Sequence, residues 1–364
     1  MSDPAVLSER EQKILGIIET ARGKRAKFRD ERITMAHGAG GKATQSLIEG
    51  LLAPAFASET LDELADAATI SAAQSQLALT TDSYVVKPMR FPGGSIGELA
   101  VNGTVNDLAV SGARPLALSL SLILEEGLSA EDLRAEVEAI AHAARVADVE
   151  IVTGDTKVVE RGHADGMYVC TTGVGVRDQR AQLSPRALRP GDRILLSGSI
   201  GEHGTAIMLA RNEFELDAAI ESDTRPLWPV VDALLDAVGP ELRCLRDATR
   251  GGVASVLNEL ARASSVAMIV REAEVPVRPD VAGAAEILGI DPMYVANEGK
   301  LVAFVAPEAA ERALGALRGV PGCEAAAEIG EVRTEPPGLV LVETSFGGKR
   351  VMDQLVGDPL PRIC

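Results

Sequence analysis

The apolar positions of this chain follow two periods, one typical of β-strands and one typical of α-helices. Apolar runs at 77–81, 116–124 and 149–153 predict strands, and the second run alternates leucine with serine, as a half-buried strand does. Between the last two runs, residues 129–144 follow helical spacing, and Ser129 with Asp132 three positions later resembles a capping box. Helices that alternate with strands predict an α/β class of fold.

A proline-rich polar stretch between residues 177 and 191 is the best candidate for a domain boundary. Beyond it the pattern repeats, and a length of 364 residues is typical of two domains. The predicted elements of the second half are strands at 193–197 and 301–305 and helices at 203–211 and 251–263. We predict four segments: an N-terminal extension at 1–32, a first domain at 33–178, a second α/β domain at 188–344, and a flexible tail at 345–364.

The tail carries two prolines and ends in a cysteine. Pro359 and Pro361 favour extended backbone, so the end of the chain can visit a remote site or another protein. Cys364 is the last residue, and a thiol on a mobile arm can carry a covalent group between sites. Taken alone, a terminal cysteine more often has no special role.

Charge narrows the possible functions. The chain has 36 Lys plus Arg against 53 Asp plus Glu, a formal net charge of −17. So acidic a protein repels phosphate backbones and anionic membrane surfaces, which argues against nucleic acid or membrane as a partner. A nucleotide could still bind, provided that a metal ion offset the carboxylates.

Two further features bear on the compartment. The first 32 residues lack the apolar core of a signal peptide, and no apolar run reaches the roughly 18 residues of a membrane span. The four cysteines form no C-x-x-C pair, which argues against a zinc site or a disulfide framework. We therefore expect a cytoplasmic protein.

A glycine-rich segment at 37–43, HGAGGKA, is the first candidate for chemistry. Its Gly38, Gly40 and Gly41 precede Lys42, as in a loop whose backbone N–H groups approach phosphates. It fails the Walker A pattern, because Ala36 and Ala43 stand where glycine and serine or threonine are required. A plain flexible loop remains the alternative.

Several carboxylates and amides stand at or near the predicted ends of strands and helices, where ligands of α/β sheets gather. Asp82 and Asp155 follow apolar strands, Lys157 comes two residues after Asp155, and Asp247 precedes a predicted helix, where it could equally be an N-cap. Asn102, Asn106 and Asp107 interrupt an otherwise apolar helix. Together they suggest oxygen ligands for Mg²⁺ bound to nucleotide phosphates.

The remaining polar candidates are single residues. Glu298 stands between a polar turn and a strand, either as an ordinary loop acid or as a general base. His163 and His203 show no partner spacing and are interpreted as surface or turn residues. Cys170 lies in a strand-like run and is interpreted as a small buried hydrophobe.

An ordered set of motifs resembles the HypE family of hydrogenase maturation factors from about residue 33 to the end of the chain. The matching segments are HGAGGK, TTDSYV, FPGGSIGELAVNGTVNDLAVSGA, LILEEGL, IVTGDTKVV, LRDATRGGV, ANEGKLV and the terminal PRIC. HypE proteins belong with aminoimidazole ribonucleotide synthetase, selenophosphate synthetase and thiamine-phosphate kinase, whose shared segments match at Asp82, at Asn106–Asp107 and at Asp155.

The resemblance implies a fold, a reaction and partners. The fold is α/β, of an α+β sandwich-like kind, with two domains and a homodimer formed through the ATP-binding N-terminal domains. Cys364 would accept a carbamoyl group from the carbamoyltransferase HypF, and ATP would drive dehydration of this group to a thiocyanate. The cyanide would then pass to iron held by the HypC–HypD complex, for the active site of [NiFe]-hydrogenase.

The chemistry of this reaction suggests roles for individual residues. Cys364 carries the reacting group, Glu298 is the candidate base, and either Lys157 or Lys42 stabilises the transferred phosphoryl group. The expected Mg²⁺ ligands are Asp82, Asp107, Asp155 and Asp247. The expected ATP-binding residues are Gly38, Gly40, Gly41, Lys42, Asp82, Asn106, Asp107, Asp155, Thr156 and Asp247.

Two other functions are compatible with the motifs. The first is a kinase or amidine synthetase that acts on a free small molecule and does not need the PRIC end. The second is a catalytically inactive scaffold for maturation partners, against which the complete set of aspartates argues.

Overall fold

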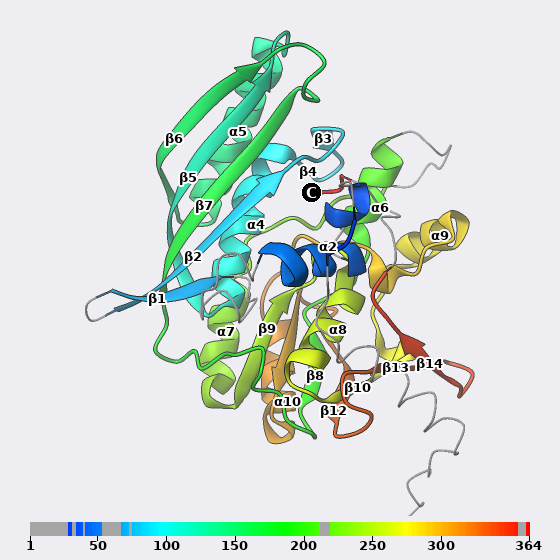
Figure 1. Ribbon diagram of the computed structural model, residues 1–364. Helices are drawn as coiled ribbons and strands as arrows, with labels where there is room; N and C mark the ends of the chain where they lie inside the picture. Colours follow the sequence, from blue (N-terminus) through cyan, green and yellow to red (C-terminus); the bar gives the residue numbers. More distant parts are fainter. Residues whose placement is uncertain are drawn as a thin grey trace, which may run out of the picture.

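The computed structural model describes residues 28–30, 34–38, 41–52, 67–72, 75–211, 219–355 and 362–364. Two sheets stand one above the other in Figure 1, each with its own helices. The α/β class predicted from the pattern of the sequence is confirmed. Among the described helices, none is long and apolar enough to cross a membrane.

The first sheet has five strands in the order β1-β2-β7-β5-β6, and helices cover one of its faces. Its pairs are antiparallel except β5 with β6, which is parallel. The strands are β1 (Ala68–Ala72), β2 (Ser75–Tyr84), β5 (Ala113–Glu125), β6 (Glu150–Val159) and β7 (Met167–Arg177), and the helices are α4 (Ile96–Val110) and α5 (Ala130–Val146). A small hairpin, β3 (Arg90–Phe91) and β4 (Gly94–Ser95), precedes α4.

Helix α4 joins the two domains. Its N-cap is Ser95, whose hydroxyl accepts a hydrogen bond from the Glu98 backbone N–H, and nearly all of its residues are buried. One side of α4 packs on β2 and β7, and another meets the second domain at α7 (Trp228–Val238) and β9 (Leu242–Asp247). A helix that is apolar on all sides is expected to be buried on all sides. The few polar side chains of α4 are therefore held by the protein that surrounds them.

The second sheet has seven strands in the order β14-β13-β10-β12-β8-β11-β9. The strands are β8 (Arg193–Leu196), β9 (Leu242–Asp247), β10 (Ala267–Arg271), β11 (Leu301–Val305), β12 (Ala327–Arg333), β13 (Val340–Glu343) and β14 (Lys349–Met352). The helices are α6 (Glu202–Ala210), α7 (Trp228–Val238), α8 (Gly252–Ala263), α9 (Pro279–Leu288) and α10 (Ala310–Arg318). Strand β11 is buried throughout, because Val302 and Phe304 belong to one core and Leu301, Ala303 and Val305 to the core on the opposite face.

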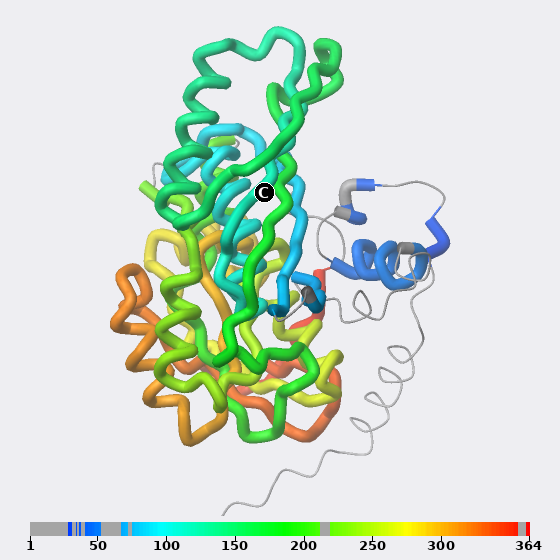
Figure 2. The backbone as a smooth tube through the Cα atoms, turned by 90° about the vertical axis from the view of Figure 1, so that its left-hand side faces the viewer, coloured from blue at the N-terminus to red at the C-terminus, as the bar shows by residue number. Residues whose placement is uncertain are grey.

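The glycine-rich segment leads into short helices that contact the second domain. A 3₁₀ turn (Met35–Gly38), α2 (Lys42–Leu47) and a π-helical turn (Ile48–Leu52) stand apart from α4 and α5 in Figure 2. The Lys42 backbone N–H donates to the Leu355 carbonyl at 3.3 Å, and Arg262 donates to the Gln45 side chain at 2.8 Å. A segment predicted with the first domain is therefore bonded to the second.

The structure differs from the sequence-based expectations at two strand ends. Strand β2 continues through Asp82 to Tyr84, and β6 continues through Asp155 to Val159, so neither aspartate follows its strand. Strand pairing uses backbone groups, so a polar side chain in the strand does not interrupt it. Part of the predicted tail, Lys349–Met352, pairs with β13 as strand β14. Pro359 and Pro361 lie outside the described residues.

The predicted cap of α5 is confirmed and can be tested. The Ser129 hydroxyl accepts a hydrogen bond from the Asp132 backbone N–H at 3.0 Å. We expect Ser129→Ala to lower the free energy of unfolding by about 1 kcal/mol, because a helix-end N–H loses its partner. Chemical denaturation measures the change. Ser129→Asp should restore the stability, and an equal loss in both variants would contradict the capping role.

Candidate active site

The end of the chain is folded into the protein. Cys364 is 7% exposed and Ile363 is 2% exposed. The backbone N–H groups of Val85 and Lys87 donate to the carbonyl oxygens of Cys364 and Arg362, each at 3.2 Å. The terminus lies near β3, β4 and α6 in Figure 1. The residue predicted to ride on a mobile arm is therefore docked in this structure.

The sulfur of Cys364 contacts an arginine side chain. Arg250 donates to it from Nη2 at 2.8 Å and from Nε at 3.2 Å. Arg250 is followed by Gly251 and Gly252, whose φ angles of 81° and 61° lie in the left-handed region. A Cβ on Gly252 would come within 2.6 Å of the Met293 carbonyl oxygen. Glycine is thus required for the turn that follows Arg250.

Burial decides the protonation of the docked thiol. It raises the pKa of Cys364 to about 11, against the opposing effect of Arg250. Glu298 and Asp82 raise this pKa further, which places both carboxyl groups within electrostatic reach of the sulfur. At neutral pH the docked sulfur is therefore a thiol and a weak nucleophile.

Glu298 is buried close to this sulfur. It is 3% exposed, and its Oε1 atom has no hydrogen-bond partner among the described residues. Burial raises the pKa of Glu298 well above its usual value, and Asp247, Asp223 and Asp82 raise it further. A buried polar atom without a partner is costly and marks a place where a ligand atom fits.

A buried ion pair holds the loop that carries Glu298. The Asp223 carboxylate accepts hydrogen bonds from the backbone N–H groups of Glu298 at 3.0 Å and Gly299 at 3.2 Å, and from Lys300 Nζ at 3.0 Å. Burial raises the pKa of Asp223, but Lys300 and the Glu298 N–H outweigh it, so this pKa lies below its usual value. A Cβ on Gly299 would meet the Asp223 carbonyl oxygen at 1.9 Å. Asp223 and Lys300 were missed in the sequence, where no spacing connects them.

Two polar residues of α4, Asn106 and Asp107, have different partners. The side-chain amide of Asn106 donates to the carbonyls of Arg225 at 3.0 Å and Glu298 at 3.2 Å, and its oxygen accepts from the Leu227 N–H at 2.7 Å. Both amide hydrogens of Asn106 are thus committed to the loops around Glu298. Asp107 accepts a hydrogen bond from the Thr80 hydroxyl at 2.8 Å.

Strand β2 and strand β9 bring two of the predicted aspartates to this region. Asp82 accepts a hydrogen bond from the Tyr84 hydroxyl at 3.1 Å, and both Asp82 and Asp107 raise the pKa of Tyr84, which burial raises most. Asp247 is the last residue of β9, whereas the N-cap of α8 is Gly251. The N-cap interpretation of Asp247 is therefore wrong, and Asp247 instead ends a strand of the second sheet.

Asp155 and Lys157 lie elsewhere within a single chain. Asp155 pairs with Ser121 of β5, which pairs with Cys170 of β7, which pairs with Ser83 of β2. Paired residues share a face and successive residues alternate, so Asp155 is on the face opposite to Asp82.

Both side chains are exposed, and Lys157 Nζ bonds to Asp155 at 2.6 Å. This bond and the neighbouring N–H of Thr156 lower the pKa of Asp155. Cys170 is partly exposed on this open face of the sheet, so its interpretation as a buried residue is wrong.

The glycine-rich segment is only partly described. Gly38 ends the 3₁₀ turn, Gly41 is the N-cap of α2, and Gly40 lies outside the described residues. Lys42 is half exposed, and its Nζ bonds to Asp353 at 2.8 Å. Within the described part of the chain, Lys42 is thus engaged with the second domain.

His203 is the main residue that sequence reasoning misjudged. It is fully buried, its Nε2 donates to the Ile363 carbonyl at 2.6 Å, and its Nδ1 lies 2.8 Å from the Ser222 hydroxyl. Burial lowers the pKa of His203, so the ring is neutral at pH 7. A carbonyl accepts only, which assigns the proton to Nε2. No pattern in the sequence pairs this histidine with the terminus.

The carboxylates near Glu298 are of the kind that binds a hard cation together with phosphate oxygens. Among the described residues no group of three or more His, Cys, Asp or Glu is arranged to hold a metal ion. Mg²⁺ does not need such a cage, since it commonly takes one or two carboxylates plus waters and phosphate oxygens. Asp82 and Asp247 both act on the pKa of Glu298, so two carboxylates flank this site.

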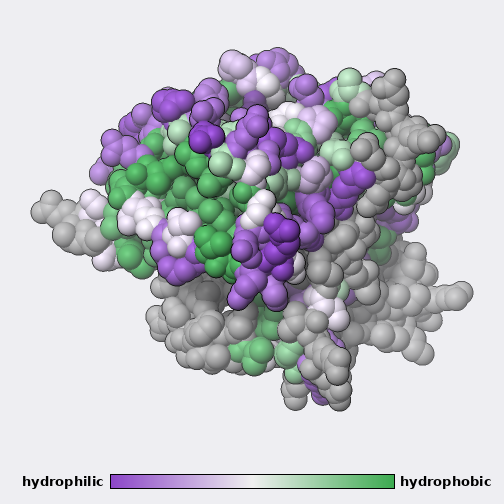
Figure 3. All heavy atoms as spheres, turned by 90° about the horizontal axis from the view of Figure 1, so that it is seen from above, coloured by the Kyte–Doolittle hydropathy of each residue, from purple (hydrophilic) through white to green (hydrophobic). Residues whose placement is uncertain are grey.

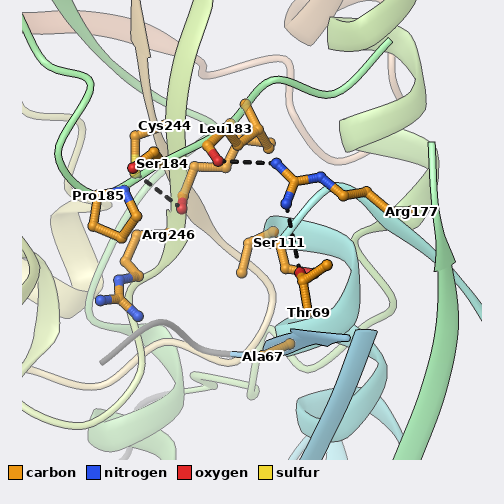
Figure 4. A pocket seen from close by; sticks show the side chains of 11 residues that line it. Ala67, Thr69, Ser111, Arg177, Leu183, Ser184, Pro185, Cys244 and Arg246 are labelled. Carbon is orange, nitrogen blue, oxygen red and sulfur yellow. Dashed lines mark hydrogen bonds between the residues drawn. The ribbon is translucent and has the colours of Figure 1, made fainter. Parts of the chain in front are cut away.

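A separate small cavity lies at the junction of the domains (Figure 4). Arg177, Arg246, Ser111 and Ser184 are among its lining residues, and its volume is about 40 Å³. Pockets for small molecules are usually about 300–1,000 Å³, so this cavity is too small for a nucleotide. It contains none of the predicted site residues.

Comparison with known proteins identifies the family. The chain matches the family models described as AIR synthase related protein, N-terminal domain, over residues 64–177 and C-terminal domain over residues 189–342. Carbamoyl dehydratase HypE of Azotobacter vinelandii is 51% identical over 340 residues, which cover 93% of this chain and 99% of the relative. The chain belongs to the HypE family. The resemblance inferred from the motifs is thus confirmed.

Other members of the family agree in sequence and structure. Carbamoyl dehydratase HypE of Escherichia coli strain K12 is 46% identical over 337 residues, covering 91% of this chain and 99% of the relative. A crystal structure of a HypE–HypF complex has a TM-score of 0.81 at 44% identity, covering 85% of this chain and 99% of that chain. Hydrogenase maturation protein HypE in complex with ATP has a TM-score of 0.77 at 45% identity, with 92% and 100% covered.

The buried ion pair beneath Glu298 should be essential for stability. We expect Lys300→Met to lower the free energy of unfolding by about 3–5 kcal/mol, because the Asp223 carboxylate keeps its burial and loses its cation. Urea denaturation measures this change. Lys349→Met removes the exposed partner of Glu343 and should change stability by less than about 1 kcal/mol. Equal effects of the two substitutions would contradict the role of the buried pair.

Proposed function

We propose that this chain catalyses the ATP-dependent dehydration of an S-carbamoyl group on its own Cys364 to a thiocyanate. The product supplies the cyanide ligand of the iron in [NiFe]-hydrogenase. The observation that carries the proposal is the docked tail, in which the Cys364 sulfur contacts Arg250 within electrostatic reach of Glu298. Relatives named carbamoyl dehydratase and a family structure with ATP support it.

The reaction removes the elements of water from the carbamoyl group. The carbamoyl oxygen is a poor leaving group until it attacks the γ-phosphorus of ATP, which forms a P–O bond and releases ADP. The nitrogen loses one proton as the carbon–nitrogen double bond forms. It loses the second as the C–O bond breaks, leaving thiocyanate on the sulfur and inorganic phosphate.

Glu298 is the proposed acceptor of a proton from the nitrogen. Its Oε1 has no partner among the described residues, so this atom can receive an N–H of the substrate. Because burial and neighbouring aspartates raise its pKa, the ionised carboxylate is a stronger base than an exposed one. Arg250 holds the sulfur, so the carbamoyl carbon attached to it is held near this acid.

We assign ATP and Mg²⁺ to the acidic side of this site. Asp82, Asp107 and Asp247 would hold the ion, which when bound neutralises charge on the phosphates. Such a cation also resolves the conflict between an acidic protein and a polyanionic substrate. The glycine-rich segment and Lys42 are proposed to approach the phosphates once Lys42 leaves Asp353.

Asp155, Thr156 and Lys157 would take part in a site only in a homodimer. They lie on β6, and on the open face of the first sheet Asp155 accompanies Leu79, Ile70 and Ile123, which are 43%, 47% and 37% exposed. The view from above in Figure 3 looks onto the end of the molecule that carries the first sheet, and it shows apolar side chains gathered between polar ones. A second copy that packs on this face would bury those side chains and bring Asp155 and Lys157 to the interface.

The remaining partners follow from the same reaction. We propose HypF as the carbamoyl donor, and a HypE–HypF complex among the similar structures supports it. The HypC–HypD complex is the proposed cyanide acceptor, and the cytoplasm is the proposed compartment. A free small-molecule acceptor is the weaker hypothesis, because the docked Cys364 already lies within electrostatic reach of Glu298.

Mass spectrometry of the intact chain tests the reaction. With HypF and a carbamoyl donor, the chain should gain a carbamoyl group that loses water only when ATP is present. Glu298→Gln should accept the group normally and lose water at least about 100-fold more slowly, because the amide is not a base. Cys364→Ala should gain no group and still bind ATP. Loss of water at the normal rate by Glu298→Gln would exclude Glu298 as the base.

Sedimentation tests the proposed dimer. Leu79→Asp places a charge on the open face of the sheet and should shift the chain from dimer to monomer. Val137→Asp is the matched control, because Val137 is 46% exposed on α5, which covers the opposite face. An unaltered chain that sediments as a monomer at micromolar concentration would contradict the dimer.

A further inference from the structure

The last three residues are held mainly through their backbone. The Arg362 carbonyl accepts from the Lys87 N–H at 3.2 Å and from Arg211 Nη2 at 2.8 Å. The Ile363 carbonyl accepts from His203 at 2.6 Å, and the Cys364 carbonyl accepts from the Val85 N–H at 3.2 Å. Only Arg250 touches the sulfur among the hydrogen bonds of the described residues.

The Arg362 side chain adds a second anchor. Its Nε donates to the Val85 carbonyl at 3.0 Å, and its guanidinium forms an ion pair with Asp165. The same guanidinium lies 5.9 Å from the centre of the Tyr168 ring, a cation–π distance. Arg362 takes a left-handed φ of 56°, which these contacts hold in place.

Asp165 belongs to a loop that is itself fixed. The loop joins β6 to β7, and the Glu125 carboxylate accepts hydrogen bonds from the N–H groups of Gly162 at 2.5 Å and Gly166 at 2.9 Å. Lys87 also bonds to Asp165, at 2.9 Å, so this carboxylate bridges the tail and the segment beside it. The anchor of Arg362 is therefore part of the folded first domain.

The docked state suits dehydration and does not suit loading. Cys364 is 7% exposed and its sulfur is a protonated thiol, so a carbamoyl donor cannot reach or use it there. Loading and delivery both require an undocked tail, whereas reaction beside Glu298 requires a docked one. The balance between the two states must therefore be set by the contacts that hold the tail.

We propose that Asp165, Arg211 and His203 are positioning residues that form a lock on the last three residues and set the docked fraction of the tail. This inference rests on the proposed function. The residues of the lock bond to backbone carbonyls and to the Arg362 side chain, and not to the sulfur. They therefore hold the tail whether the sulfur is free, carbamoylated or cyanated. It thereby sets how much of each catalytic cycle the tail spends docked, where dehydration occurs, and how much it spends undocked, where loading and delivery occur.

Thiol labelling measures the docked fraction without any catalysis. The full-length chain is treated with N-ethylmaleimide under native conditions, and labelling of Cys364 is followed in its C-terminal peptide. Asp165→Asn removes the charge that pairs with Arg362 and should raise the labelling rate about tenfold, because labelling proceeds from the undocked state. Asp165→Glu should largely restore the slow rate.

A matched control and a second variant complete the experiment. Asp148→Asn alters an exposed ion pair with Arg114 and should leave labelling unchanged. Arg211→Gln should raise labelling as Asp165→Asn does, and it decides the matter if Asp165→Asn fails to fold. In single turnovers from preloaded carbamoyl protein, both variants should lose water more slowly while binding ATP normally.

The outcomes separate the lock from the reaction. Labelling rates equal to the unaltered chain in folded Asp165→Asn or Arg211→Gln would overturn the lock, whatever the catalytic result. Faster labelling in both variants, together with no loss of water in the unaltered chain, would support the lock and reject the proposed function.

Discussion

The contact between the Arg250 guanidinium and the Cys364 sulfur ties the end of the chain to the junction of the two domains. It requires a left-handed turn at Gly251 and Gly252 on one side and a docked tail on the other. The carboxyl group of Glu298 is close enough for its charge to act on this sulfur. The geometry of the site thus depends on a contact between residues that are 114 positions apart.

Burial is the physical condition that gives these groups their chemistry. It raises the pKa of Glu298 and of the Cys364 thiol in the same small region, where Asp82 adds negative charge to both. A carboxyl group in such a place has a raised pKa, so its ionised form binds a proton more strongly than an exposed carboxylate does. Stability is maintained nearby by the Asp223–Lys300 pair, whose charges compensate each other and whose carboxylate fixes the Glu298 loop.

Helix α4 transmits this arrangement between the domains. It packs on the first sheet, while its Asn106 bonds to the carbonyl of Glu298 and to the N–H of Leu227. A polar side chain in an apolar helix is stable only when its hydrogen bonds are satisfied, and here the second domain satisfies them. The Asn106 amide therefore holds the loops of the second domain that carry Glu298 and Leu227.

The sequence by itself determined the features that depend on local pattern. The strand at Leu301–Val305 and the cap at Ser129 follow from apolar periodicity and from a hydroxyl three residues before an N–H, both of which are local. Long ordered motifs also determined the family, while Cys364 and Glu298 were candidates from their own positions in the sequence.

The tertiary structure alone decided which residues meet. Asp155 was grouped with Asp82, but a register through two intervening strands puts their side chains on opposite faces. His203 was dismissed, yet it bonds to the carbonyl of Ile363 from 160 positions away. The face of a sheet on which a side chain lies, and its contacts with distant residues, depend on how sheets and domains pack. The spacing of residues along the chain does not predict either of them.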